Sequence, residues 1–454
     1  MIRNKNYGKA LIDAAGRLCA YASDYQYLFK NKTKSNADKA RLYIEGIVTS
    51  ELNNIERISE TLDSSYHAMH HFISDSNWDA RAVMDKVAKD VSRSLPKQTL
   101  TGLLIDESGW EKKGNKSVGV GHQYCGNVGK TANSQVAVYG SLCNGKNASL
   151  VDCRLYLPTS WTSDSERCDE ASIPIDERVF KTKQELAADI IKHQLEMGIA
   201  FDFVGADGLY GNDAAFARKI NNMGIVYMLD IHSDQKIFLE KPELYLPERK
   251  TAKGPAPKKL KANTDHFAAN QYIGLLKPSD WEAIDIRDSA KGVLKGMFHF
   301  KTVYIWDKNI NTVEERLLVI SKRKTKEGEE IKYSFTNASL GQYTKQAIAY
   351  MQAQRFFVEH SFKEQKQILG MDQFQTRKWL SWHHQIALNM MVGCFVLKEK
   401  LFNQDEIPIL SARDIMDFLK FKFYKEMTEE RLLRQLKERH IKRHRDIDYC
   451  YSKQ

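Results

Sequence analysis

Two short apolar runs that each end in an aspartate constrain the fold of this 454-residue chain more than any other feature. The first is Thr101–Asp106 (TGLLID) and the second is Phe201–Asp207 (FDFVGAD). Both have the length and composition of buried β-strands. The carboxyl ends of strands in α/β sheets open into a shared crevice, where such sheets bind their ligands. The pattern therefore predicts that Asp106 and Asp207 lie together at one edge of a sheet, with Asp230 as the alternative to Asp207.

The segments around these runs indicate a mixed α/β core. Strand-like residues at 134–142 and 148–157 flank the turn signal Asn144–Asn147, which predicts an antiparallel hairpin. Alternating helices and strands follow, at residues 183–197, 201–206, 212–223 and 225–229. Such alternation is typical of a parallel half-sheet. We therefore expect an α/β fold with a mixed sheet.

The rest of the chain divides into helical ends and an interruption of the core. Apolar residues at helical spacing run from Ala37 to Leu62 and from Trp78 to Leu95, and Pro96 ends this region. From Lys241 on, four of the nine prolines stand among basic residues and precede short strand-like pieces. Helical periodicity returns from Gln342 through Lys400. We expect five parts: a helical N-terminal region (1–95), a first core segment (96–234), a β-rich insertion (235–335), a second core segment (336–400) and a basic helical C-terminal region (401–454).

Charge and hydropathy favour a polyanionic partner over a membrane. The chain has 68 Lys and Arg against 58 Asp and Glu, a net charge of +10. From Phe418 onward 11 basic residues face six acidic ones, which suits phosphate binding, although a solvated helix face is the alternative. The longest mostly apolar run, Ile386–Leu397, is shorter than the roughly 20 residues of a spanning helix. The N-terminus lacks the apolar core of a signal peptide, so we expect a cytoplasmic protein without a membrane partner.

A third acidic candidate lies on a late helix, Arg355–Lys366 (RFFVEHSFKEQK). At about 100° per residue, Arg355 and Lys366 lie within roughly 40° of Glu359, so an acid and two bases share one helix face. The alternative is an ordinary i,i+4 ladder of ion pairs through Arg355, Glu359 and Lys363. The two aspartates on strands favour the first interpretation.

These motifs together resemble the DDE transposases of bacterial insertion sequences. The resemblance covers roughly residues 40–400 and rests on motifs that occur in the family's order: KGNKSVGV (113–120), QYCGNVGK (123–130), RLYLP (154–158) with Trp161, ADGLYG (206–211) and the helix with Glu359. The separations also fit, with 101 residues from Asp106 to Asp207 and 152 from Asp207 to Glu359. The resemblance implies a ribonuclease-H-like mixed-sheet catalytic core, interrupted by the β-rich insertion between the second Asp and the Glu.

The resemblance further implies an activity and its cofactor. Asp106, Asp207 and Glu359 would be the catalytic residues and the ligands of two Mg²⁺ ions, with Mn²⁺ able to substitute. Mg²⁺ prefers hard oxygen ligands, and paired ions can activate an attacking oxygen and stabilise a leaving one. The implied reaction is cleavage of double-stranded DNA at terminal inverted repeats and joining of the 3′-hydroxyl ends to target DNA. The alternative from another class is a catalytically inactive or repurposed sequence-specific DNA-binding protein.

The resemblance also implies DNA contacts, a dimer or higher oligomer in the DNA complex, and association with the nucleoid. The family's helix signature, Tyr-x2-Arg-x3-Glu-x6-Lys, is met at Arg355, Glu359 and Lys366, but Gln352 stands at the tyrosine position. We expect Arg355 and Lys366 to bind phosphate, with Lys363 as a weaker candidate. The helical N-terminal region would bind the DNA ends, helped by the basic C-terminal region.

Trp306 is the remaining predicted DNA contact. It lies in the insertion, after Val303, Tyr304 and Ile305, near a predicted strand end. In the family that the chain resembles, an aromatic residue of the insertion holds a base displaced at the cleavage site. The competing interpretation is that Trp306 packs in the core of the β-rich insertion.

Overall fold

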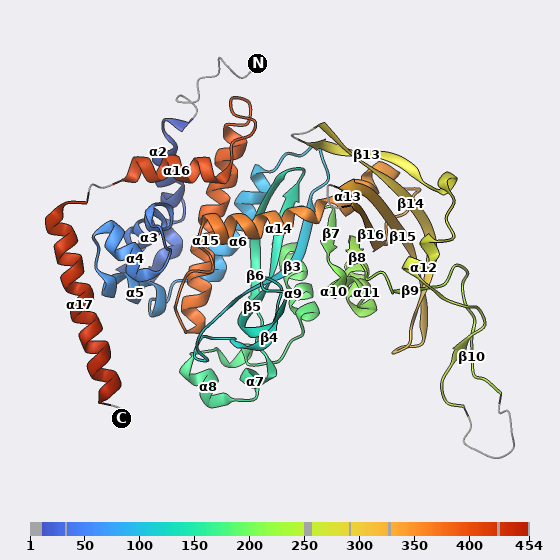
Figure 1. Cartoon of the computed structure of the whole chain (residues 1–454), viewed down its shortest axis with the longest axis horizontal. Coiled ribbons are helices and arrows are strands. Elements are labelled where there is room, and N and C mark those ends of the chain that lie inside the picture. The colour runs from blue at the N-terminus through green and yellow to red at the C-terminus, as the bar shows by residue number, and fades with distance from the viewer. Residues whose placement is uncertain are drawn as a thin grey trace. The chain divides into compact units, whose positions relative to one another are not determined.

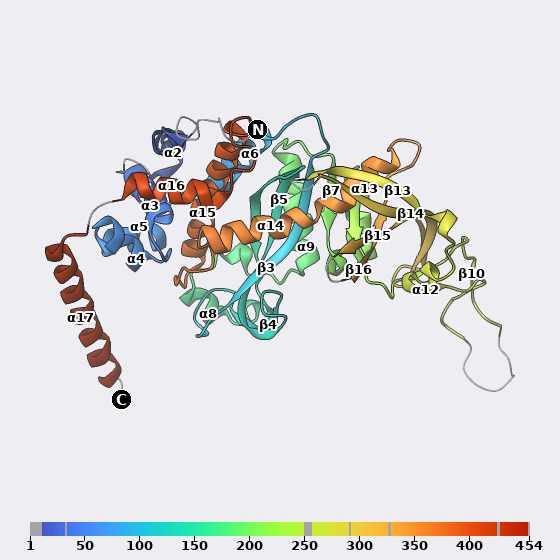
Figure 2. The same cartoon turned by 45° about the horizontal axis from the view of Figure 1, so that its top comes forward.

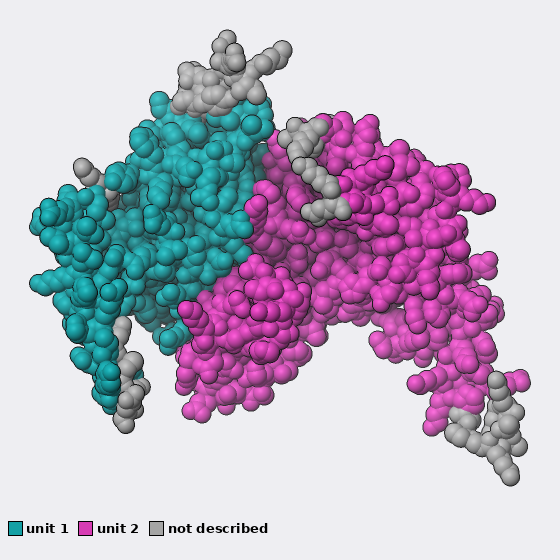
Figure 3. Space-filling model, in the orientation of Figure 1, with its two compact units in different colours: residues 1–83, 364–454 teal, residues 84–363 magenta. Residues whose placement is uncertain are grey.

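The computed structural model describes residues 11–31, 34–248, 257–289, 292–325, 328–424 and 427–452. The chain forms two compact units (Figure 3). Unit 1 comprises residues 1–83 and 364–454, and unit 2 comprises residues 84–363. The boundaries of the five predicted parts stay a prediction.

Unit 2 is built on a ten-stranded sheet whose central strands have a ribonuclease-H-like topology (Figure 1). In the spatial order β6-β5-β3-β7-β8, β5 runs antiparallel to β3 and β6, whereas β7 and β8 run parallel to β3. The predicted mixed-sheet core is therefore confirmed. The strands are β3 (Gly102–Glu111), β4 (Gly121–Cys125), β5 (Lys130–Asn144), β6 (Asn147–Leu155), β7 (Phe203–Ala206) and β8 (Val226–Asp230).

The first strand is longer than its apolar run. We expected it to end at Asp106, but β3 continues to Glu111 because it pairs with β5 along its whole length. Its parallel partner β7 stops earlier, with Ile105 opposite Ala206. Strand β4, which has no apolar run and was not predicted, pairs with the first residues of β5, Lys130 to Ser134.

Helices cover both faces of this sheet. On β5, a Cβ added at Gly140 would lie 2.9 Å from Ile190 of α9 (Lys183–Glu196), whereas the Ser141 hydroxyl lies 3.1 Å from that of Ser361 on α14 (Phe356–Lys363). The two helices therefore lie on opposite faces (Figure 2). The other helical segments of this core are α7 (Thr159–Thr162), α8 (Ser165–Glu170), η2 (Ile175–Glu177), α10 (Gly208–Gly211) and α11 (Ala214–Asn222).

The insertion forms an antiparallel meander that extends the core sheet. Its last strand pairs antiparallel with β8, with Ser334 opposite Asp230, so backbone hydrogen bonds join the insertion to the core. The strands are β13 (Glu282–Ser289), β14 (Gly292–Asp307), β15 (Thr312–Thr325) and β16 (Gly328–Thr336). Short elements precede them: β9 (Lys236–Ile237), β10 (Leu244–Tyr245), β11 (Lys261–Ala262), β12 (Phe267–Ala268), α12 (Ala269–Ile273) and η3 (Pro278–Asp280). Part of the predicted proline-rich connection, residues 249–256, lies outside the described residues.

The single helix expected from Arg355 to Lys366 is wrong, and the helical periodicity from Gln342 to Lys400 belongs to several helices. Helix α13 (Lys345–Gln354) ends before Arg355, α14 follows, and a π-helix, η4 (Glu364–Ile368), comes next. Gly370 then adopts a φ of 63°, a left-handed conformation typical of a helix end, and α15 (Trp379–Phe402) begins only after this break.

Unit 1 is helical, as expected. The helix predicted from Ala37 to Leu62 is in fact two, because the backbone becomes extended at Ser50 and Asn54 caps the second helix by accepting a hydrogen bond from the Arg57 amide. No helix among the described residues is long and apolar enough to cross a bilayer. The elements are α2 (Ala14–Ser23), η1 (Gln26–Phe29), β1 (Lys30–Asn31), β2 (Lys34–Ser35), α3 (Ala37–Thr49), α4 (Ile55–Leu62), α5 (Tyr66–Ser74), the start of α6 (Ala80–Ser94), α15, α16 (Ala412–Phe423) and α17 (Glu429–Tyr451).

We predict that Gly211→Ala destabilises the protein. A Cβ at Gly211, the last residue of α10, would lie 1.9 Å from the backbone oxygen of Asp230 in β8. Backbone cannot yield as a flexible side chain does, so α10 must move, and such overpacking costs about 1–3 kcal/mol. Urea denaturation measures the loss. Gly114→Ala, where a Cβ meets open space, is the matched control, and equal midpoints for the two variants would contradict the prediction.

Candidate active site

The register of two parallel strands brings the predicted aspartates together. Ile105 of β3 pairs with Ala206 of β7, so the next residue of each strand, Asp106 or Asp207, lies at the same level of the sheet. Asp207 is also the N-cap of α10, and its Oδ1 accepts a hydrogen bond of 3.0 Å from the Leu209 amide. The Asp106 Oδ1 accepts one of 2.8 Å from the Glu107 amide. Both carboxylates are thus fixed by local backbone.

Glu107 is a third carboxylate of this cluster, and sequence reasoning missed it. Ligand atoms of Asp106, Glu107 and Asp207 all lie within 4.8 Å of one another. Alternation along a strand places Glu107 on the face opposite Asp106. Since β7 ends at Ala206, however, no β7 backbone separates the two faces at this level. Lys183 (3.0 Å) and the Tyr210 hydroxyl (3.1 Å) both donate to Glu107.

Glu359, the third predicted catalytic residue and metal ligand, does not belong to this cluster of ligand atoms and is connected to it only through Arg355. The Glu359 side chain is 56% exposed, and its Oε1 lies 3.3 Å from Arg355 Nη1. On its other side Arg355 pairs with Asp230 of β8, with Nε 2.5 Å from Oδ2. The charges of Asp106 and Asp207 also act on Arg355. One guanidinium therefore faces carboxylates from three strands and a helix.

This arrangement differs from the i,i+4 ladder that was the alternative. The Arg355–Glu359 pair forms, but Lys363 makes no ion pair with any residue that the structure describes. The shortest ion pair of Arg355 is instead with Asp230, on strand β8, which is distant along the chain. The break between α13 and α14 falls at Arg355. No proline or glycine stands beside Arg355, so no signal in the sequence marks this break.

Gln352, at the position of the family tyrosine, supports this pair from behind. The Gln352 side chain is buried and donates 2.9 Å to the Ser334 hydroxyl, which in turn donates 2.6 Å to Asp230 Oδ1. Gln352 also donates to the backbone oxygen of Val319. A chain of hydrogen bonds therefore runs from α13 through β16 to the carboxylate that holds Arg355.

Burial and mutual repulsion shift the acid groups of the cluster. The pKa of Asp106 lies well above its ordinary value, because burial and the charges of Asp207 and Glu107 outweigh the opposing effect of Arg355. The pKa of Asp207 is raised by burial and by the charges of Glu107 and Asp230, against the opposing effects of Arg355 and the Leu209 amide. Burial opposes the charge of Arg355, yet the surrounding carboxylates raise its pKa overall. The site therefore carries more negative charge than one arginine can neutralise.

The donor set fits a hard divalent cation. Carboxylate oxygens from Asp106, Glu107 and Asp207 converge within 4.8 Å, and oxygen is the ligand that Mg²⁺ prefers. Burial and the convergence of like charges raise the pKa values of Asp106 and Asp207 although Arg355 opposes both effects, so a further cation is favoured there. The residues present thus fit the metal that the sequence predicted.

The predicted DNA contacts lie in different places. Lys363 ends α14 in unit 2, whereas Lys366 belongs to the π-helix of unit 1 and is buried there. Trp306 is half-buried in β14, lines a cavity of the insertion, and its indole nitrogen is buried without a hydrogen-bond partner among the described residues. Part of the positive charge of the C-terminal region is paired within unit 1, where Arg439 forms an ion pair of 2.6 Å with Glu60.

Comparisons with known proteins identify the family of this chain. A family model described as DDE superfamily endonuclease matches residues 26–293, so the chain belongs to this family. A relative from Microchaete diplosiphon, described as a probable transposase for insertion sequence element IS701, is 29% identical over 225 residues. That match covers 48% of this chain and 54% of the relative, so the chain spans about half of the relative's length. The predicted resemblance to insertion-sequence transposases is confirmed.

Among solved structures, the cryo-EM structure of a piggyBac transposase synaptic complex with hairpin DNA matches 94% of this chain and 82% of that chain, at 9% identity and a TM-score of 0.34. The family match includes Asp106 and Asp207 but ends before Glu359.

We predict that Asp106→Asn stabilises the metal-free protein at neutral pH. A raised pKa means that the folded chain binds the proton of Asp106 more tightly than the unfolded chain does. Ionisation of Asp106 therefore lowers the free energy of unfolding as the pH rises above the carboxyl's ordinary value of 3.8.

Thermal denaturation in EDTA between pH 4 and pH 8 measures this effect. The melting temperature of the variant should exceed that of the wild type at pH 8, and the difference should shrink as the pH falls. Asp176→Asn, at an exposed carboxylate, is the control. A variant that melts below the wild type throughout would show that Asp106 contributes net favourable interactions.

Proposed function

We propose that this chain is a DNA transposase that cleaves at terminal inverted repeats and joins the 3′-hydroxyl ends to target DNA. The observation that carries the proposal is the convergence of Asp106, Asp207 and Glu107 at adjacent strand ends, with Arg355 connecting them to Glu359. Family membership supports the endonuclease class. The relative's description as a probable insertion-sequence transposase supports the particular reaction.

Asp106, Asp207 and Glu359 would hold two Mg²⁺ ions, and Mn²⁺ could substitute. Bound metal would activate the attacking oxygen and stabilise the leaving oxygen during phosphodiester transfer. The protein's own part is to hold the carboxylates: β3 and β7 fix the two aspartates by register, and α14 presents Glu359 at the surface, where DNA can reach it.

Basic and aromatic residues would position the DNA. In this proposal Arg355, Lys363 and Lys366 bind phosphates near the cut, and Trp306 contacts a displaced base. The half-buried indole of Trp306, which lines a cavity, supports a ligand contact over the alternative of core packing. Base–aromatic stacking contributes roughly 1–3 kcal/mol.

In this proposal the helical N-terminal region, residues 1–95, recognises the DNA ends. The basic C-terminal region helps assembly or adds DNA contacts. Because Arg439 and Lys442 pair with Glu60 and Glu56 of α4, we expect the C-terminal helix to act partly through this contact. A dimer or higher oligomer would hold both DNA ends.

The cluster itself disfavours the alternative of a repurposed DNA-binding protein. Converging carboxylates with raised pKa values cost stability, and strongly perturbed groups in a crevice are typical of functional sites. A protein that only binds DNA gains nothing from them.

We predict that Asp106→Asn, Asp207→Asn and Glu359→Gln each abolish Mg²⁺-dependent cleavage of terminal-repeat DNA and preserve DNA binding. Loss of an outer-shell partner of a metal lowers activity about 10- to 100-fold, so loss of a ligand should exceed this. Gel assays of cleavage and mobility shift in parallel measure both. Glu177→Gln, at an exposed surface carboxylate, is the matched control, and full cleavage by any of the three variants would remove that residue from the site.

A further inference from the structure

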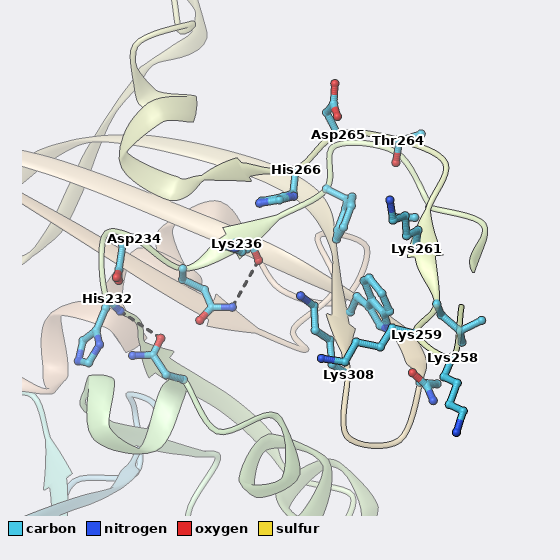
Figure 4. A pocket seen from close by; sticks show the side chains of 17 residues that line it. His232, Asp234, Lys236, Lys258, Lys259, Lys261, Thr264, Asp265, His266 and Lys308 are labelled. Carbon is cyan, nitrogen blue, oxygen red and sulfur yellow. Dashed lines mark hydrogen bonds between the residues drawn. The ribbon is translucent and has the colours of Figure 1, made fainter. Parts of the chain in front are cut away.

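The insertion contains a cavity of about 1080 Å³ whose lining is strongly basic (Figure 4). Its walls come from the segment after β8, from residues 258–266 and from the hairpin between β14 and β15. Five lysines line it, against two aspartates: Lys236, Lys258, Lys259, Lys261 and Lys308. None of these lysines forms an ion pair with any residue that the structure describes. Like charges gathered without counter-ions are unfavourable until an anion joins them.

Aromatic rings stand among these cations. Trp306 lines the cavity, and the ammonium of Lys308 lies 5.2 Å from the centre of its ring. Phe238 and His266 form a second ring pair in the lining, with centroids 5.8 Å apart. The indole nitrogen of Trp306 is buried, so the ring and not its N–H is the part of this side chain that the cavity offers to a ligand.

The cavity also adjoins the carboxylate cluster. Asn212 and His232 form part of its wall, and the His232 amide donates 3.3 Å to the Asn212 side chain. Asn212 ends α10, the helix that Asp207 begins, and a Cβ on Gly208 would lie 2.6 Å from the His232 ring. The side of the cavity formed by Asn212 and His232 therefore lies against the short helix that follows Asp207.

We propose that this cavity binds a single DNA strand, held by its phosphates on the lysines and by its bases on the aromatic rings. A basic groove combined with ring faces is the general means of binding single strands without sequence preference. The volume is slightly above the roughly 300–1,000 Å³ of small-ligand pockets, which suits a few nucleotides of one strand better than the full width of a duplex. The inference rests on the proposed function, because it names the form of DNA that leaves the cleavage site.

The test measures binding of the full chain to a fluorescein-labelled oligo(dT) of eight nucleotides, by anisotropy in EDTA at several salt concentrations. Metal is absent, so cleavage does not enter the result. The test variant combines Lys236→Gln, Lys259→Gln and Lys308→Gln. The matched control combines Lys97→Gln, Lys301→Gln and Lys324→Gln, which are exposed lysines of unit 2 outside the cavity.

The test variant should bind oligo(dT) with a shallower salt dependence than the control. Each single-strand phosphate contact contributes about 0.7 to the slope of log K against log salt, so three lost contacts lower the slope by about 2. Trp306→Leu should weaken binding about 5- to 100-fold at fixed salt, as expected for the loss of one stacked base. Thermal denaturation checks that each variant folds.

Three results would overturn the inference. The first is a test variant that matches the control in slope and affinity. The second is an equal loss of affinity for blunt duplex DNA, which would make the cavity a general phosphate surface. The third is lost binding of tripolyphosphate with unchanged binding of oligo(dT), which would assign the cavity to a small anion. The inference and the proposed function can also fail separately. If the test variant loses oligo(dT) binding but the wild type does not cleave terminal-repeat DNA, single-strand binding by the cavity is supported and the transposase function is rejected.

Discussion

The guanidinium of Arg355 is the interaction on which the carboxylate cluster depends. Asp106, Asp207, Asp230 and Glu359 all act on it, and it is the group that offsets their mutual repulsion. Two unit charges 4 Å apart interact by about 4 kcal/mol at the effective dielectric constant of a protein surface, so an unneutralised cluster would be costly. Arginine suits this position because its charge persists at every physiological pH.

The contacts of Arg355 with these carboxylates also suggest how it could act both before and after metal binding in the proposed reaction. Without metal, the carboxylates engage Arg355. Bound cations would take over their neutralisation, and the guanidinium would then be available to a DNA phosphate, which it can bind through two parallel hydrogen bonds. The Asp230 carboxylate also accepts a hydrogen bond from the Ser334 hydroxyl, so it would keep one partner if Arg355 moved to a phosphate.

The β-rich insertion takes part in building this site. Its strand β16 extends the core sheet at β8, and Ser334 of that strand connects Gln352 to Asp230. Where the family has a tyrosine, this chain uses the shorter Gln352 side chain in a buried hydrogen-bond chain. The insertion also provides the lysine-lined cavity, so a single element both orients the arginine and forms the adjoining surface.

Much of the core could be predicted because its signals are local. Apolar runs and turn residues identify strands, and the rule that parallel strands end in a common crevice was sufficient to pair Asp106 with Asp207. The role of Glu107 could not be predicted, because it depends on β3 continuing past Asp106 while β7 ends at Ala206, which is a property of strand pairing. The helix break at Arg355 and its pairing with Asp230, 125 residues away along the chain, arise from tertiary contacts that no spacing encodes.

The most direct test of the account is to locate Mn²⁺ by anomalous diffraction in crystals of the protein with cleaved terminal-repeat DNA. The account predicts two ions at the Asp106–Asp207 cluster, with Glu359 turned inward as a further ligand. Ions absent from this cluster, or ions present there with Glu359 turned to solvent, would contradict it.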